Sequence, residues 1–85
     1  MRLPVIRHIH SFIKENDQDF VIEAIAVLEH LTELESLKDE ELDVIGELLS
    51  NLEGALEADK MIKDGMTEKE AFNTFMKRVM GSIDQ

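Results

Sequence analysis

The feature that most constrains the fold is residues 37–64, a segment without proline in which apolar residues recur three or four positions apart. The stripe consists of Leu42, Ile45, Leu49, Leu52 and Leu56. This spacing places all of them on one face of an α-helix, whereas a half-buried strand would need strict alternation. The segment therefore predicts one long helix of about 42 Å, at 1.5 Å per residue.

A helix of that length exceeds the expected width of the molecule. An 85-residue domain has a radius of gyration near 12 Å and is roughly 30 Å across. Either the helix bends at "SNLEG" (50–54), where Ser and Gly favour a kink, or it projects and packs against a second copy. Both alternatives are open at this point.

Three other segments have the same periodicity, and no strand pattern competes with them. Together the four predict an all-α fold, a compact four-helix single domain over residues 1–85, with helices near 4–15, 19–34, 37–64 and 68–82. Residues 20–34 are apolar around most of the circumference, so we expect the second helix to be the central one. The expected core comprises Ile9, Phe12, Ile25, Leu28, Leu31, Ile45, Leu49, Leu52, Phe72, Phe75 and Val79.

Turn and capping residues set the expected boundaries. Pro4 suits a first helical turn, and Asp17 or Asp19 can cap the second helix. The third helix has a candidate capping box in Ser36 with Asp39, and the fourth has one in Thr67 with Glu70. Gly65 can end the third helix in the left-handed conformation.

Small residues four apart form a second stripe on the long helix, nearly opposite the leucine stripe. They are Gly46, Ser50, Gly54 and Ala58. Such a stripe would let another helix backbone approach closely, and we take it as the candidate interface of a homodimer. The alternative is that exposed glycines are tolerated at up to about 1 kcal/mol each.

The charge pattern argues against direct nucleic-acid binding. The formal net charge is −10, and the acids concentrate in the middle of the chain: seven in residues 15–35 with no Lys or Arg, and eight in residues 36–59 against Lys38 alone. Phosphate backbones would repel such a surface. No apolar run reaches the roughly 20 residues of a membrane span, and the first residues lack a signal-peptide pattern, so we expect a cytoplasmic location.

No catalytic, cofactor or metal signature is present. His8 and His10 lie about 160° apart on a helix and cannot share one ion, and His30 lacks the Glu three residues earlier that di-iron bundles use. Serines and threonines occur outside any nucleophile motif. We therefore expect no enzyme activity, no catalytic residues, no cofactor and no metal.

The segments "LPVIRHIHSFI", "SLKDEELDVIGELLSN" and "FMKRVMGSID" resemble a small family of short, acidic, all-helical bacterial proteins of unknown function. The resemblance implies a bacterial cytoplasmic protein and supplies no functional residues. We expect a non-enzymatic helical interaction module that forms a homodimer and presents its acidic surface to a basic protein partner. The alternative is an acidic mimic of nucleic acid that binds a basic nucleic-acid-binding protein.

Overall fold

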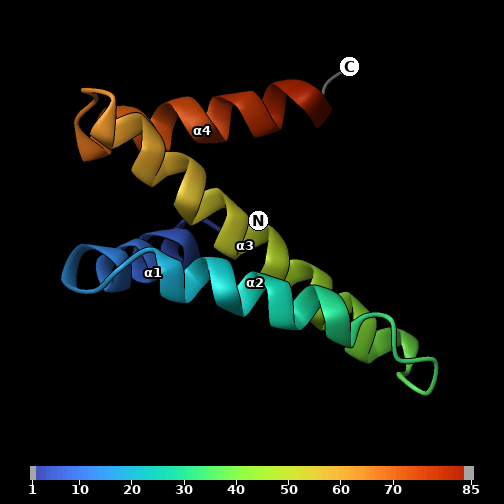
Figure 1. Cartoon of the computed structure of the whole chain (residues 1–85). Coiled ribbons are helices and arrows are strands. Elements are labelled where there is room, and N and C mark those ends of the chain that lie inside the picture. Colours follow the sequence, from blue (N-terminus) through green and yellow to red (C-terminus); the bar gives the residue numbers. More distant parts are fainter. Residues whose placement is uncertain (1, 84–85) are drawn as a thin grey trace.

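The computed structural model describes the backbone of residues 2–83 and the side chains of residues 2–80. Four helices follow one another along the chain, and no strand occurs in the described part (Figure 1). The all-α fold and the four-helix single domain are confirmed. The boundaries lie within three residues of those predicted: α1 Leu3–Glu15, α2 Asp19–Leu31, α3 Asp39–Lys63 and α4 Glu68–Ile83.

Two of the predicted end signals act as expected, and the cap of α2 differs. Pro4 lies in the first turn of α1. Before α2 the Asp17 carboxylate accepts a hydrogen bond from the Asp19 N–H at 3.0 Å, but Gln18 occupies the N-cap position and its side chain makes no cap hydrogen bond. Gly65 ends α3 with φ of 118°, and the N–H groups of Gly65 and Met66 donate to the carbonyls of Ile62 and Met61. This pattern satisfies the last carbonyls of a helix, and a residue with a Cβ would be strained at Gly65.

The two capping boxes have different outcomes. At α4 the Thr67 N–H donates to the Glu70 carboxylate and the Glu70 N–H donates to the Thr67 hydroxyl, both at 3.1 Å, as predicted. At α3 the expected pairing of Ser36 with Asp39 is wrong. The Lys38 N–H donates to Glu41 instead, at 3.0 Å, because Lys38 is the last extended residue before the helix.

The central helix is α3, not α2. Helix α3 contacts each of α1, α2 and α4, and it is uninterrupted through "SNLEG" over 25 residues, about 37 Å. Helix α2 runs antiparallel along one side of α3, and Gln18 at its start reaches Lys63 near the C-terminal end of α3 (Figure 1). The expectation that α2 would be central is wrong. Only α3 packs extensively on α2, so several apolar side chains of α2 remain exposed.

The core lies where α1 and α4 meet the C-terminal half of α3. Phe72 and Phe75 of α4 are buried there as predicted, and Ile45 of α3 is also buried. Phe12 and Leu31 were expected in the core but are exposed, by 44% and 39%. The buried apolar cluster consists of Ile6, Ile13, Val21, Ala55, Ala58, Met61, Ala71, Phe72 and Phe75.

The molecule is flat and open for its size. Its extents are 43 × 35 × 18 Å, and its radius of gyration is 13.8 Å, against about 12 Å for an average 85-residue domain. The accessible surface is 6099 Å², whereas a folded monomer of this mass exposes about 5100 Å². The excess, on the order of 1000 Å², indicates surface that the four helices do not cover for one another.

Candidate interaction surface

Several exposed apolar side chains lie on one side of the α2–α3 pair. On α2, Phe20, Val27 and Leu31 fall within an arc of about 60°, together with half-buried Ala24. Val27 is 67% exposed and Phe20 is 58% exposed. On α3, Val44 and Leu48 are exposed one turn apart. With Phe12 of α1 these side chains form what we call the apolar face: Phe12, Phe20, Val27, Leu31, Val44 and Leu48.

The two helices direct these side chains to the same side. On α2 the exposed stripe lies about a quarter turn from buried Val21, and on α3 Val44 lies about a quarter turn from buried Ile45 in the same rotational sense. Because α2 and α3 run antiparallel (Figure 1), equal rotations point to the same side of the pair. The apolar face is therefore contiguous across both helices.

Two grooves support this arrangement. One is lined by Leu31, Leu37, Val44 and Ile45 with Glu40 and Glu41, beside the α2–α3 connection. The other lies between α1 and α2, where the rings of Phe12 and Phe20 meet edge to face at 5.8 Å. Its lining comprises His8, Ile9, Ser11, Phe12, Glu15, Phe20, Val21, Ala24 and Leu52. Acidic side chains border both grooves.

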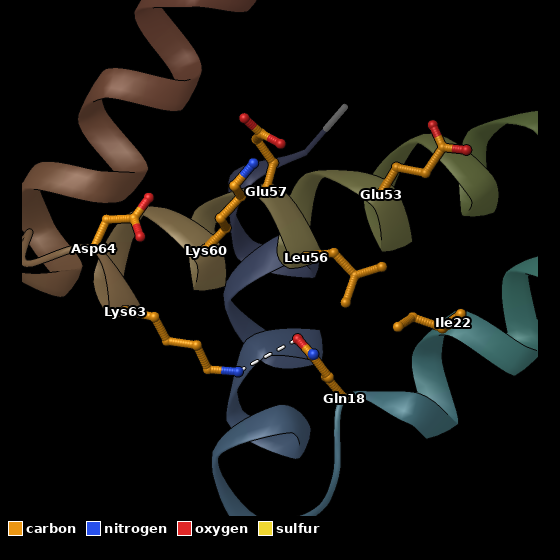
Figure 2. Close-up of a pocket in the computed structure, with 8 residues that line it drawn as sticks. All are labelled: Gln18, Ile22, Glu53, Leu56, Glu57, Lys60, Lys63 and Asp64. Atoms are coloured by element: carbon orange, nitrogen blue, oxygen red, sulfur yellow. Dashed lines mark hydrogen bonds between the residues drawn. The ribbon is translucent and has the colours of Figure 1, made fainter.

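The opposite side of the α2–α3 pair is charged rather than apolar. Figure 2 shows Leu56 and Ile22 pointing into the space between the helices, and the Lys63 ammonium donating to the Gln18 side chain at 3.3 Å. The remaining lining is Glu53, Glu57, Lys60 and Asp64. Charges of both signs alternate here, so this pocket concentrates no single charge for a ligand.

The stripe predicted as the interface divides between two environments. Gly46 is exposed, and a Cβ there would meet nothing within 4 Å. Ser50 is half-buried. Gly54 and Ala58 are buried within the chain, and a Cβ on Gly54 would lie 3.0 Å from Phe75. The close approach at Gly54 is to α4 and α1 of the same chain. Gly54 and Ala58 were expected to contact a second copy, but both are buried by their own chain.

A buried polar cluster joins α1 to α3. His10 Nε2 lies 3.1 Å from Asp59 Oδ1, and both side chains are at least nine-tenths buried. The Lys63 ammonium lies 2.9 Å from Asp59 Oδ2, at an angle that makes an ion pair without a hydrogen bond. The Phe72 ring packs edge to face on His10 at 5.5 Å. Such a cluster orients two helices but offers no open position for a substrate.

Sequence reasoning considered His10 as a possible metal ligand and missed this cluster. The signal was present, because Ile6, His10 and Ile13 are spaced four and three apart and all three are buried. A polar side chain on a buried stripe needs a buried partner. The identity of that partner, Asp59, could not be read from the spacing.

A second buried polar contact fixes the start of α1. The Asn51 side chain accepts a hydrogen bond from the Arg2 N–H at 2.9 Å and donates to the Glu47 carbonyl at 2.8 Å. Arg2 to Asn51 and His10 to Asp59 each span 49 residues. Two contacts with the same separation mean that α1 and α3 run parallel and in register.

Ion pairs at the surface join α4 to its neighbours. Lys14 of α1 lies 2.7 Å from Glu68 at the start of α4, and the hydrogen bond from Lys14 lowers the pKa of Glu68 below its usual value. Arg78 lies 3.0 Å from Glu57. These exposed pairs contribute little to stability individually, but they direct α4 onto the C-terminal half of α3.

Among residues 2–80, no group of three or more His, Cys, Asp or Glu side chains is arranged to hold a metal ion. None of the described helices combines the length and apolarity needed to cross a membrane.

Comparison with known proteins gives one match. A family model covers residues 1–84, and its description is a family of unknown function, DUF6952. No curated protein and no solved structure matches the chain. Because the match spans nearly the whole chain, the protein belongs to DUF6952, a family of unknown function.

Proposed function

We propose that the protein is a non-enzymatic helical interaction module that self-associates as a homodimer, and that the apolar face is the contact between copies. The observation that supports this most directly is the apolar face itself, which covers both helices of the α2–α3 pair. Contiguous exposed apolar surface of this extent is typical of protein interaction sites. The cytoplasmic, bacterial setting expected from the sequence is part of the proposal.

The amount of surface fits a second copy. A standard interface removes about 800 Å² from each partner, and this chain exposes on the order of 1000 Å² more than a compact monomer of its mass. A two-fold dimer uses the same patch twice, so one apolar face on each chain is sufficient. The sequence has no cysteine that could form a disulfide, and residues 2–80 hold no metal ligand set, so neither stabilises this small domain within the part that the structure describes.

The test is molar mass in solution. The wild-type chain should have twice its 9.7 kDa mass by size exclusion with light scattering. Val27→Glu should give the monomer, because burying an unpaired carboxylate in an apolar contact is strongly unfavourable. Ile22→Glu is the matched control, since Ile22 is also exposed on α2 but lies on the charged side of the pair.

Ile22→Glu should therefore remain dimeric. A monomeric wild type would contradict the proposal. So would a Val27→Glu variant that keeps the wild-type mass, because the contact would then lie elsewhere.

A further inference from the structure

The exposed stripe of α2 has the spacing of a two-helix seam. Phe20, Ala24, Val27 and Leu31 are separated by four, three and four residues, which is the spacing of core positions in coiled coils. None of the four is buried in the chain. A seam of this kind fits another helix of the same length, and the excess surface described above fits a second copy of this chain.

The two edges of this seam differ. Along the edge toward α3 lie Val21, which is buried, and Leu28, which is half-buried. Along the outer edge lie Glu23 and His30, seven residues apart and both exposed. The charged group nearest His30 in the chain is Glu33, 3.7 Å away. The outer edge is thus the only charged edge of the seam on α2.

Chain direction decides what the outer edge meets. With a parallel partner helix, the outer edge of one copy faces the inner edge of the other, and Glu23 meets apolar side chains. With an antiparallel partner, outer edge faces outer edge. A two-fold axis between Ala24 and Val27 then brings Phe20 level with the partner subunit's Leu31, and Glu23 within about two residues, or 3 Å along the axis, of the partner subunit's His30.

We propose that two copies pair along α2 in antiparallel orientation, with Glu23 of each copy beside the partner subunit's His30. The inference rests on the proposed self-association and adds the orientation and the contact that selects it. Flanking charges set orientation in coiled coils. An arrangement that opposes the Glu23 carboxylate to an imidazole, rather than to the apolar side chains of a parallel partner, also avoids leaving this carboxylate unpaired against apolar surface.

Cross-linking tests the orientation directly, because the chain contains no cysteine. Glu23→Cys and His30→Cys are prepared separately, mixed, and treated with a short bis-maleimide. The mixture should cross-link most efficiently, whereas each variant alone should react less, since its own cysteines lie about 7.5 Å apart along the axis for Glu23→Cys and about 13.5 Å apart for His30→Cys. Efficient cross-linking of each variant with itself, at unchanged dimer mass, would overturn the antiparallel pairing and leave the proposed function intact. A monomeric mass for the wild type would overturn both.

Charge exchange provides the second measurement. Glu23→Lys should raise the dimer dissociation constant by roughly two- to thirtyfold, the effect expected from the loss of two exposed contacts of this kind, one on each side of the two-fold axis, and adding His30→Glu should restore it. Glu29→Lys is the matched control, because it makes the same change of charge on the same helix but points away from the seam. Equal effects of Glu23→Lys and Glu29→Lys would contradict the contact between Glu23 and the partner subunit's His30.

Discussion

The two halves of α3 have similar sequence patterns and very different surroundings. In the C-terminal half, α1 and α4 cover the helix, and the buried residues are Asn51, Gly54, Ala55, Ala58, Asp59 and Met61. In the N-terminal half only Ile45 is buried, while Val44 and Leu48 are exposed. Apolar spacing therefore predicts the helix, whereas the number of helices packed on it decides which of its faces are buried.

The largest expected effect on stability concerns the C-terminal half of α3, which α1 and α4 cover. Ile6 is fully buried, and its Cδ1 lies 3.2 Å from where a Cβ on Gly54 would be. Ile6→Ala should lower the free energy of unfolding by about 2–5 kcal/mol, since it leaves a cavity. Urea unfolding measures it, in a Val27→Glu background so that association does not contribute. Val44→Ala is the comparison in the uncovered half and should change stability by about 0.5 kcal/mol or less.

A smaller effect is expected at Gly54, where a new side chain meets Phe75 and Ile6. Gly54→Leu should destabilise the folded chain by about 1–3 kcal/mol through overpacking, measured by thermal unfolding. Leucine at Gly54 should thus act on packing within one chain, whereas the sequence placed Gly54 in the contact between copies. A Gly54→Leu variant of normal stability and halved molar mass would restore Gly54 to the interface.

Gly46 should respond in the opposite direction. A Cβ at this position meets nothing within 4 Å, so Gly46→Ala should stabilise the chain by about 0.5–1 kcal/mol by reducing the entropy of the unfolded state. Circular dichroism melting of Gly46→Ala beside wild type is sufficient. A loss of stability would contradict this expectation, because it would mean that other atoms pack against Gly46 and that the N-terminal half of α3 is covered there.

The smallest effect concerns the start of α4, the helix that covers the C-terminal half. Hydrogen bonds from the Thr67 backbone and side chain lower the pKa of Glu70 below its usual 4.5. A lowered pKa in the folded state adds stability above the unfolded value, and that stability is lost as pH falls through the folded pKa. Thr67→Ala should raise the pKa of Glu70 partway toward 4.5 in an NMR titration. The pKa of Glu68, held low by Lys14, is the internal control.

The sequence predicted correctly several features that depend on residues close together along the chain. The four helices, the Gly65 end of α3 and the capping box of Thr67 with Glu70 depend on residues within a few positions of each other, and all are confirmed. The central position of α3 was not predicted, because the apolar content of α2 measures only how much surface could be buried. Its actual burial depends on where α1 and α4 pack.

The sequence could predict that an interaction surface exists, but not which residues form it. The length of the third helix and its stripe of small residues indicated association, and this remains a prediction. The small-residue stripe could not identify the surface, since Gly54 fits a neighbour within its own chain as well as it would fit another subunit. Phe12 and Leu31 follow the same spacing as core residues, and only their exposure distinguishes them.

The parallel register of α1 and α3 has a consequence for synthesis of the chain. Helix α1 is synthesised before α3, and the residues that anchor it, Asn51 and Asp59, follow 49 positions after their partners Arg2 and His10. At 5–20 residues per second this is a delay of roughly 2–10 s. Throughout that interval the face of α1 that carries Ile6, His10 and Ile13 has no partner from its own chain. The basic, amphipathic helix α1 is therefore synthesised seconds before the residues on which it packs in the folded chain.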